Sequence, residues 1–154
     1  MNKKTESHPD LGIKIIAVIN GIAAVLHILF WTLAFIRLPS ISYFESAPEK
    51  INLATVYGFG LADIIWSVPF LFIGSLLLLK GKLIGWMCAH FANVLYWYSF
   101  TVIILRDNSS NSISPGSIIF LPFALFSFWA AYYLWKVRGT FLSLSPVAEY
   151  LNRI

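Results

Sequence analysis

Four long apolar runs constrain this chain more than any other feature of its sequence. They cover about residues 15–36, 53–79, 83–105 and 118–135, and each reaches or slightly exceeds the roughly 17 to 25 residues that a helix needs to cross a bilayer. Strands are excluded because the runs lack period-two alternation and because lipid offers no partners to an exposed backbone. With 58% hydrophobic and 12% charged residues, a soluble domain of this size is excluded too. The sequence therefore predicts an all-α, polytopic membrane protein with four transmembrane helices in an antiparallel bundle.

The basic residues predict how the bundle is oriented. We expect one membrane domain, residues 15–138, flanked by tails at residues 1–14 and 139–154. The first apolar run is too long for a cleaved signal peptide and is not followed by a small-x-small cleavage site, so we expect it to be retained. If both tails lie on the same side of the membrane, eight of the 11 Lys and Arg residues lie on that side as well. This excess predicts that both termini are in the cytoplasm. The expected location is the cytoplasmic membrane of a bacterium or the endoplasmic reticulum of a eukaryote. The second tail is expected to contain a short interfacial helix that begins at Ser145.

The net charge of +4 calls for no nucleic-acid partner, because a basic rim facing anionic lipid headgroups explains it. The single Cys88 excludes an internal disulfide and a thiolate zinc site. No glycine-rich phosphate loop and no Ser-His-Asp order is present. We therefore expect no metal and no cofactor.

The connections differ in length. Residues 80–82 are short enough to require a helical hairpin, whereas residues 37–52 can fold over the mouth of the bundle. Residues 106–115, rich in Ser and Asn, are interpreted as a solvated linker. Pro69 is expected to kink the second helix.

Asp63 is the only acid inside any of the four runs. A carboxyl group at bilayer depth costs roughly 2.5 to 3.5 kcal/mol on insertion scales and usually faces a cavity or the bundle interior, where it has a function. The alternative is structural, with Asp63 paired to His27 so that two helices are locked together.

Counting about 1.5 Å per helical residue from one membrane face places His27, Asp63 and Tyr96 at similar depths of about 14 to 15 Å, with Asn93 near 18 Å. We expect these side chains to face one another across a cavity. Asn93 could instead be interhelical glue, and each candidate tryptophan could be lipid-facing bulk. The expected ligand-binding residues are Trp31, Trp66, Asn93, Tyr96, Trp97 and Trp129.

The second run contains Asp63-x5-Pro69-Phe70 and ends in Lys80-Gly81, and the first run contains Leu26-His27-Ile28. Together these three patterns resemble the EXPERA domain, the family of emopamil-binding sterol isomerases and sigma-type receptors. The resemblance covers roughly residues 25–108 and implies a helical membrane protein with a cavity for a lipophilic ligand. The family's sites use more than one acid, whereas this chain has one within the apolar runs, with Glu45 and Glu49 nearby in a loop.

The resemblance implies one concrete reaction, the shift of a lipid double bond by proton transfer. Asp63 would be the acid or the carboxylate that stabilises a cation, and His27 the proton shuttle, so these two are the catalytic candidates. Asn93 would orient the ligand, and Trp66 or Trp97 would form a cation–π wall.

Two other classes of function stay open. One is a small proton- or cation-coupled carrier, in which Asp63 titrates near the axis of a homodimer. The other is a non-catalytic subunit of a larger membrane complex, whose glycines allow close helix packing. The first reading predicts a lipophilic small molecule and membrane lipids as partners.

Overall fold

The computed structural model describes residues 9–143, and every element in that range is helical. Four segments are long and apolar enough to cross a membrane, namely α1, the continuous run of α2, η2 and α3, then α4, and finally α5. This finding confirms the prediction of a multi-pass helical membrane protein. The elements are α1 (Leu11–Arg37), the 3-10 turn η1 (Ile41–Tyr43), α2 (Ala47–Ala62), the π-helical turn η2 (Asp63–Ser67), α3 (Val68–Leu79), α4 (Leu83–Ser110), α5 (Pro115–Lys136) and α6 (Arg138–Ser143).

The helices extend beyond the apolar runs from which they were predicted. The first begins at Leu11, and α4 continues to Ser110. The interpretation of residues 106–115 as a linker is therefore wrong for its first half. The carboxylate of Asp107 accepts hydrogen bonds from the backbone N–H of Ser114 and the hydroxyl of Ser117, which joins the end of α4 to the start of α5. The predicted tail helix from Ser145 lies outside the described residues.

The second span changes its helical geometry at Asp63. The N–H of Val68 bonds to the carbonyl of Asp63, five residues back, so the turn from Asp63 to Ser67 is π-helical. Pro69 follows at once and has no N–H to donate to the preceding turn, which is a recognised cause of helix distortion. The expected irregularity thus lies just ahead of the proline, and π-helical turns are frequent at functional sites.

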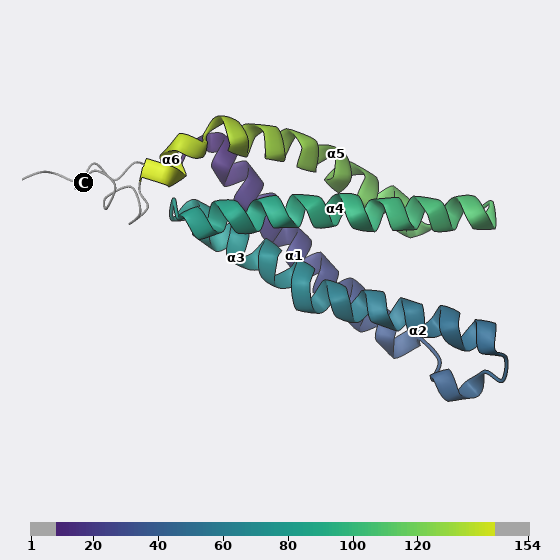
Figure 1. Cartoon of the computed structure of the whole chain (residues 1–154). Coiled ribbons are helices and arrows are strands. Elements are labelled where there is room, and N and C mark those ends of the chain that lie inside the picture. Colours follow the sequence, from purple (N-terminus) through teal and green to yellow (C-terminus); the bar gives the residue numbers. More distant parts are fainter. Residues whose placement is uncertain (1–8, 144–154) are drawn as a thin grey trace, which may run out of the picture.

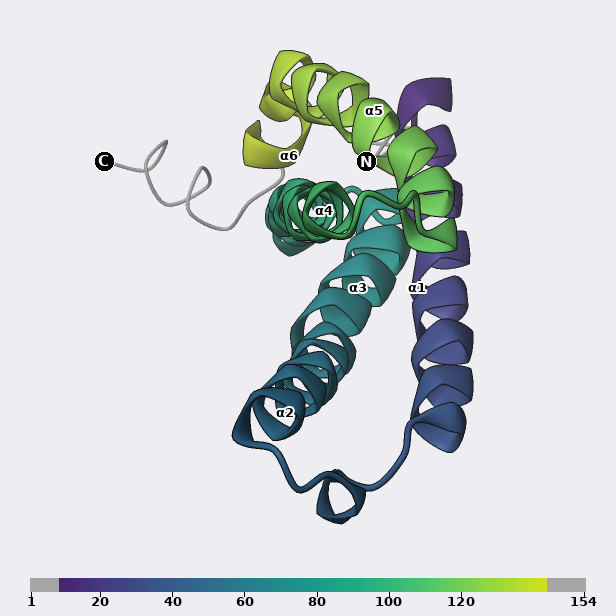
Figure 2. The same ribbon diagram turned by 90° about the vertical axis from the view of Figure 1, so that its right-hand side faces the viewer.

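Each membrane-spanning segment packs mainly against the next segment in the sequence, through contacts of α1 with α3, α3 with α4, and α4 with α5. Figures 1 and 2 show α1 and the α2–α3 run diverging from α4 toward the end of the molecule that carries η1. We call that end the loop end, and the opposite one, with the 80–82 turn and α6, the turn end. Contacts between α1 and α5 are few by comparison.

The turn end is the tightly packed one. Its core consists of Ile13, Ile16, Ala17, Leu78, Ala89, Ala130, Leu134 and Phe141. Glycine permits the close approach of α3 and α4, because a methyl group on Gly85 would overlap the backbone of Leu77 and Leu78. The hydroxyl of Tyr133 on α5 donates a hydrogen bond to Asp10, next to the start of α1, and this bond holds the pKa of Asp10 below its usual value. Tight packing at this end leaves the outer halves of α1, α4 and α5 free to enclose a space.

Candidate functional site

The Asp63 carboxylate joins the second span to α1. Trp31 donates its indole N–H to Oδ2 at 2.9 Å, and Ser67 donates its hydroxyl to Oδ1 at 3.0 Å. Space for the indole comes from Gly60, one turn before Asp63, because a methyl group there would collide with the ring of Trp31. Both oxygens of the carboxylate are thus committed to neutral donors, one from each helix.

His27 lies one turn before Trp31 on α1 but does not bond to Asp63. Its Nδ1 lies 3.0 Å from the carbonyl oxygen of Ala23. Since a carbonyl can only accept, Nδ1 carries the proton, and in the neutral imidazole Nε2 has the free lone pair. No ion pair joins His27 to Asp63 in the described part of the chain. The expected pairing of Asp63 with His27 is therefore wrong, and Trp31 is the α1 residue that bonds to Asp63.

A cavity of about 200 Å³ lies between α1, α4 and the first half of α5, toward the loop end. It is partly open, and several side chains at its rim are exposed on the surface of α1 and α5. Only two of its lining side chains, His27 and Tyr96, carry polar atoms. The lining residues are Ala23, Leu26, His27, Leu29, Phe30, Tyr96, Gly116, Ile119, Phe120 and Phe123.

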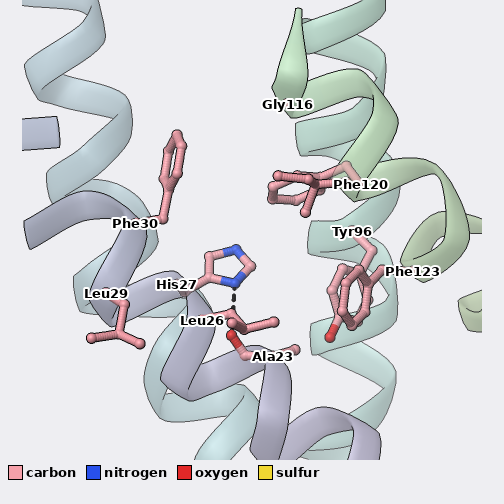
Figure 3. A pocket seen from close by; sticks show the side chains of 10 residues that line it. Ala23, Leu26, His27, Leu29, Phe30, Tyr96, Gly116, Phe120 and Phe123 are labelled. Atoms are coloured by element: carbon pink, nitrogen blue, oxygen red, sulfur yellow. Dashed lines mark hydrogen bonds between the residues drawn. The ribbon is translucent and has the colours of Figure 1, made fainter. Parts of the chain in front are cut away.

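Figure 3 shows His27 of α1 and Tyr96 of α4 on opposite sides of this cavity, with the hydroxyl of Tyr96 pointing toward the Ala23 end and the free ring nitrogen of His27 pointing the other way. The imidazole meets Phe120 edge-on, with the ring centres 5.4 Å apart. Tyr96 stacks on Phe123 at 5.9 Å, is 3% exposed, and has no hydrogen-bond partner for its hydroxyl among the described residues. Two aromatic side chains of α5 therefore hold the two polar ones in place.

A narrow crevice, with no room for a water molecule, lies beside the cavity and shares His27, Tyr96 and Phe120 with its lining. It is lined by His27 and Tyr96 together with Ser67, the residue that bonds to the Asp63 carboxylate. Asp63 itself lines neither the cavity nor the crevice. Ser67 therefore connects the Asp63 carboxylate to the residues around this crevice.

The structure brings some of the predicted site residues together and separates others. His27 and Tyr96 share the cavity, and Trp31 binds Asp63 behind it. Trp66 is 59% exposed on the outside of the bundle, where it stacks on Phe70. The remaining three predicted residues do not line the cavity: Asn93 is buried without a partner among the described residues, Trp97 packs on Phe128, and Trp129 packs on Phe126 and Tyr133. Their proposed part in binding stays a prediction.

On α5 the sequence reasoning selected Trp129 and missed the residues of that helix that line the cavity. Phe120 and Phe123 form one wall of the cavity, and Gly116 and Ile119 complete that side. The available signal was the pair of phenylalanines three residues apart around Pro122, a spacing that places both on one helix face. These lining residues of α5 are all apolar, so no polar side chain indicated from the sequence that this helix face lines a cavity.

Among the described residues, no group of three His, Cys, Asp or Glu side chains is placed so that it could bind a metal ion. Cys88 is buried and unpaired by any disulfide. Comparisons with family models, with curated proteins and with solved structures gave no match for this chain.

Proposed function

We propose that this multi-pass membrane protein binds one lipophilic ligand within the bilayer, in the cavity between α1, α4 and α5. The observation that carries the proposal is the lining itself, which is apolar except for His27 and Tyr96. Ligand sites in proteins typically combine mostly apolar walls with a few polar groups that orient the ligand. In a bundle whose helices only support one another, an unfilled space of this kind would be destabilising.

The size of the cavity supports an occupant. At about 24 cal/mol per Å³, leaving about 200 Å³ unfilled would cost on the order of 5 kcal/mol. This figure is an upper bound because the cavity is partly open. An apolar ligand removes most of that cost, as benzene does in an engineered cavity of about 150 Å³.

The rim indicates how a ligand reaches the site. Leu26, Leu29 and Ile119 line the cavity and are also exposed on the outer surface of the helices. In a membrane that surface faces acyl chains. Because complete ligand sites usually measure about 300 to 1,000 Å³, the cavity accommodates one end of a membrane-dissolved molecule, and the remainder extends between α1 and α5 into lipid.

Isomerisation of a double bond by Asp63 and His27 stays a second proposal, in keeping with the resemblance to the EXPERA domain. Ser67 favours it, since this residue bonds to the Asp63 carboxylate and also lines the crevice beside His27. Binding has the better support because Asp63 does not line the cavity. Asp63→Asn separates the two, since it should abolish turnover of an accepted lipid and leave binding in the cavity largely intact.

Both termini are proposed to lie in the cytoplasm, on the strength of the charge asymmetry of the loops. Reporter fusions at each end and in the loop formed by residues 38–46 test this orientation. A reporter active in the loop and inactive at both ends would contradict it, if that reporter functions only in the cytoplasm.

Native mass spectrometry of the purified protein tests the binding proposal. Leu26 lines the cavity and is 44% exposed, so Leu26→Trp can fill its mouth without entering the packed core. Ile22 lies one turn earlier, is 53% exposed and does not line the cavity, which makes Ile22→Trp the matched control. We expect a discrete lipophile bound to the wild type and to Ile22→Trp, and its loss from Leu26→Trp. Retention by Leu26→Trp, or no discrete lipophile in any preparation, would reject the proposal.

A further inference from the structure

One polar side chain from each membrane span lies in a single buried layer of the bundle. This polar layer consists of Asn20 of α1, Ser75 of α3, Asn93 of α4 and Ser127 of α5, each at most 8% exposed. On its own helix, each lies between a residue of the turn-end core and a residue of a second apolar cluster toward the loop end. These flanking pairs are Ala17 and Ala23, Leu78 and Leu71, Ala89 and Tyr96, and Ala130 and Phe123. Because the flanking residues of all four helices pack together on both sides, the polar residues share one level.

The two serines of the polar layer have hydrogen-bond partners, and the two asparagines have none. Ser75 donates its hydroxyl to a backbone carbonyl of α1 at 2.6 Å, and Ser127 donates to a carbonyl of its own helix at 2.7 Å. Asn20 is 0% exposed and Asn93 is 4% exposed, yet neither amide oxygen nor amide nitrogen of either residue has a partner among the described residues. Buried polar groups are hydrogen-bonded in the great majority of cases, and an amide without partners is strongly disfavoured in apolar surroundings.

The hydroxyl of Tyr96 is a third buried group without a partner in the described part of the chain. Tyr96 follows Asn93 by one turn on α4, just as Ala23 follows Asn20 by one turn on α1. In Figure 3 this hydroxyl points toward the Ala23 end of the cavity, away from the free ring nitrogen of His27. Since α1 and α4 both run from the turn end to the loop end, that direction is toward the polar layer. The ring of Tyr96 thus belongs to the wall of the cavity, whereas its hydroxyl faces the two asparagines.

We infer that the polar layer is a binding site for internal water, held by the side-chain amides of Asn20 and Asn93 and by the hydroxyl of Tyr96. Water both donates and accepts hydrogen bonds, which is what two amides and a hydroxyl together require. Buried waters typically make about three hydrogen bonds to polar groups that otherwise lack partners. Small buried side chains flank the two asparagines and leave more room than bulky ones would, namely Ala17, Ala24, Ala89 and Ala92.

Other ways to satisfy these groups are less complete. A cation would bind the amide and hydroxyl oxygens but would offer no acceptor to the two NH₂ groups. It would also lack a counter-charge, because the only acid within the apolar runs, Asp63, is bonded to Trp31 and Ser67. A direct bond between Asn20 and Asn93 would leave the hydroxyl of Tyr96 without a partner. Water is therefore the ligand that matches all three groups.

Water-edited solid-state NMR of the full chain in liposomes tests the inference. Asparagine and leucine are labelled with ¹⁵N, magnetisation is selected on water protons, and its transfer to each labelled group is followed with time. Leu78 and Leu134 are the dry references, because both are 0% exposed members of the turn-end core. We expect the side-chain amides of Asn20 and Asn93 to receive water magnetisation well before the backbone amides of the two leucines. Transfer to the asparagines as slow as to the leucines would overturn the inference, and this measurement needs no variant.

Asn20→Leu shows whether one water site serves both asparagines. Leucine is similar in size to asparagine but has no hydrogen-bonding group, so the transfer to Asn93 should fall to the level of the dry references. Asn52→Leu is the matched control, because Asn52 is exposed on α2, and it should leave the transfer to Asn93 unchanged. Undiminished transfer to Asn93 in Asn20→Leu would contradict a shared site.

A cation in the polar layer is recognised by a different result. The side-chain resonances of Asn20 and Asn93 would then shift when sodium in the buffer is replaced by choline, and this outcome would also overturn the inference. The water site does not depend on the ligand proposed for the cavity, because binding there is measured separately through Leu26→Trp. Either proposal can therefore fail without the other.

Discussion

Replacing Trp31 with phenylalanine removes the donor that ties α1 to the Asp63 carboxylate. The bond is short, 2.9 Å from the indole nitrogen to Oδ2, and the indole is largely buried. After the change the carboxylate keeps one donor, the hydroxyl of Ser67. Phenylalanine preserves much of the aromatic packing against Phe35, so most of the expected loss comes from the hydrogen bond.

The magnitude depends on the charge of the acceptor. Interhelical hydrogen bonds measured by double-mutant cycles in a membrane protein average about 0.6 kcal/mol and reach about 1.7 kcal/mol. Bonds to an ionised group are stronger, about 1.5 to 3 kcal/mol. We expect the coupling free energy between Trp31 and Asp63 to lie in the range for bonds to an ionised group, about 1.5 to 3 kcal/mol. The reason is that the carboxylate accepts two hydrogen bonds and has no cationic partner among the described residues.

A double-mutant cycle measures this coupling. Unfolding free energies in mixed detergent micelles are compared for the wild type, Trp31→Phe, Asp63→Asn and the double variant. Trp66→Phe is the control, since its indole is exposed and makes no hydrogen bond in the described structure. A coupling within error of zero, or an equal loss in Trp66→Phe, would show that Asp63 does not join the two helices.

Three further results are expected from the same unfolding assay. Gly85→Ala forces a methyl group into the backbone of α3 and should destabilise the protein by about 1 to 3 kcal/mol. Gly58→Ala is the control, because Gly58 faces open space, and this change should be neutral or slightly stabilising. Equal effects of the two substitutions would refute the close approach of α3 and α4. Ser75→Ala removes a hydrogen bond of 2.6 Å to a buried backbone carbonyl of α1 and should cost about 0.5 to 1.5 kcal/mol; no loss would show that this bond contributes nothing. Because the bond from Tyr133 lowers the pKa of Asp10, its contribution is present above the unfolded-state pKa and is lost as the pH falls through the folded-state value. Asp10→Asn and Tyr133→Phe should therefore both weaken the acid dependence of the unfolding midpoint, and a profile identical to the wild type in both would contradict this account.

Local sequence patterns predicted the spans well and their ends poorly. A run of apolar residues has to be helical in lipid whatever surrounds it, which is why four spans were found. The ends depend on individual hydrogen bonds beyond the apolar core. Asp107, for example, lies past the third run, yet it is buried and bonded to the start of α5.

Asp63 and His27 could be chosen as site candidates from the sequence because polar groups are rare at bilayer depth. Their partners could not be predicted. Estimated depths placed the two residues in one layer, but depth does not state which way a side chain turns about its helix axis. In the structure His27 lines the cavity with Tyr96 and packs on Phe120, whereas Asp63 accepts hydrogen bonds from Trp31 and Ser67.

The sequence alone determined that this chain is a four-span helical membrane protein with a few costly polar groups inside it, because hydrophobicity and helix formation in lipid are local properties. Only the tertiary structure decided which of those groups share a cavity, and that Phe120 and Phe123 of α5 form its wall. The physical reason is that membrane helices are apolar on all sides, so periodicity marks no inner face. Their rotation is set by packing, as where Gly74 of α3 lies against the backbone of α4 at Ala89.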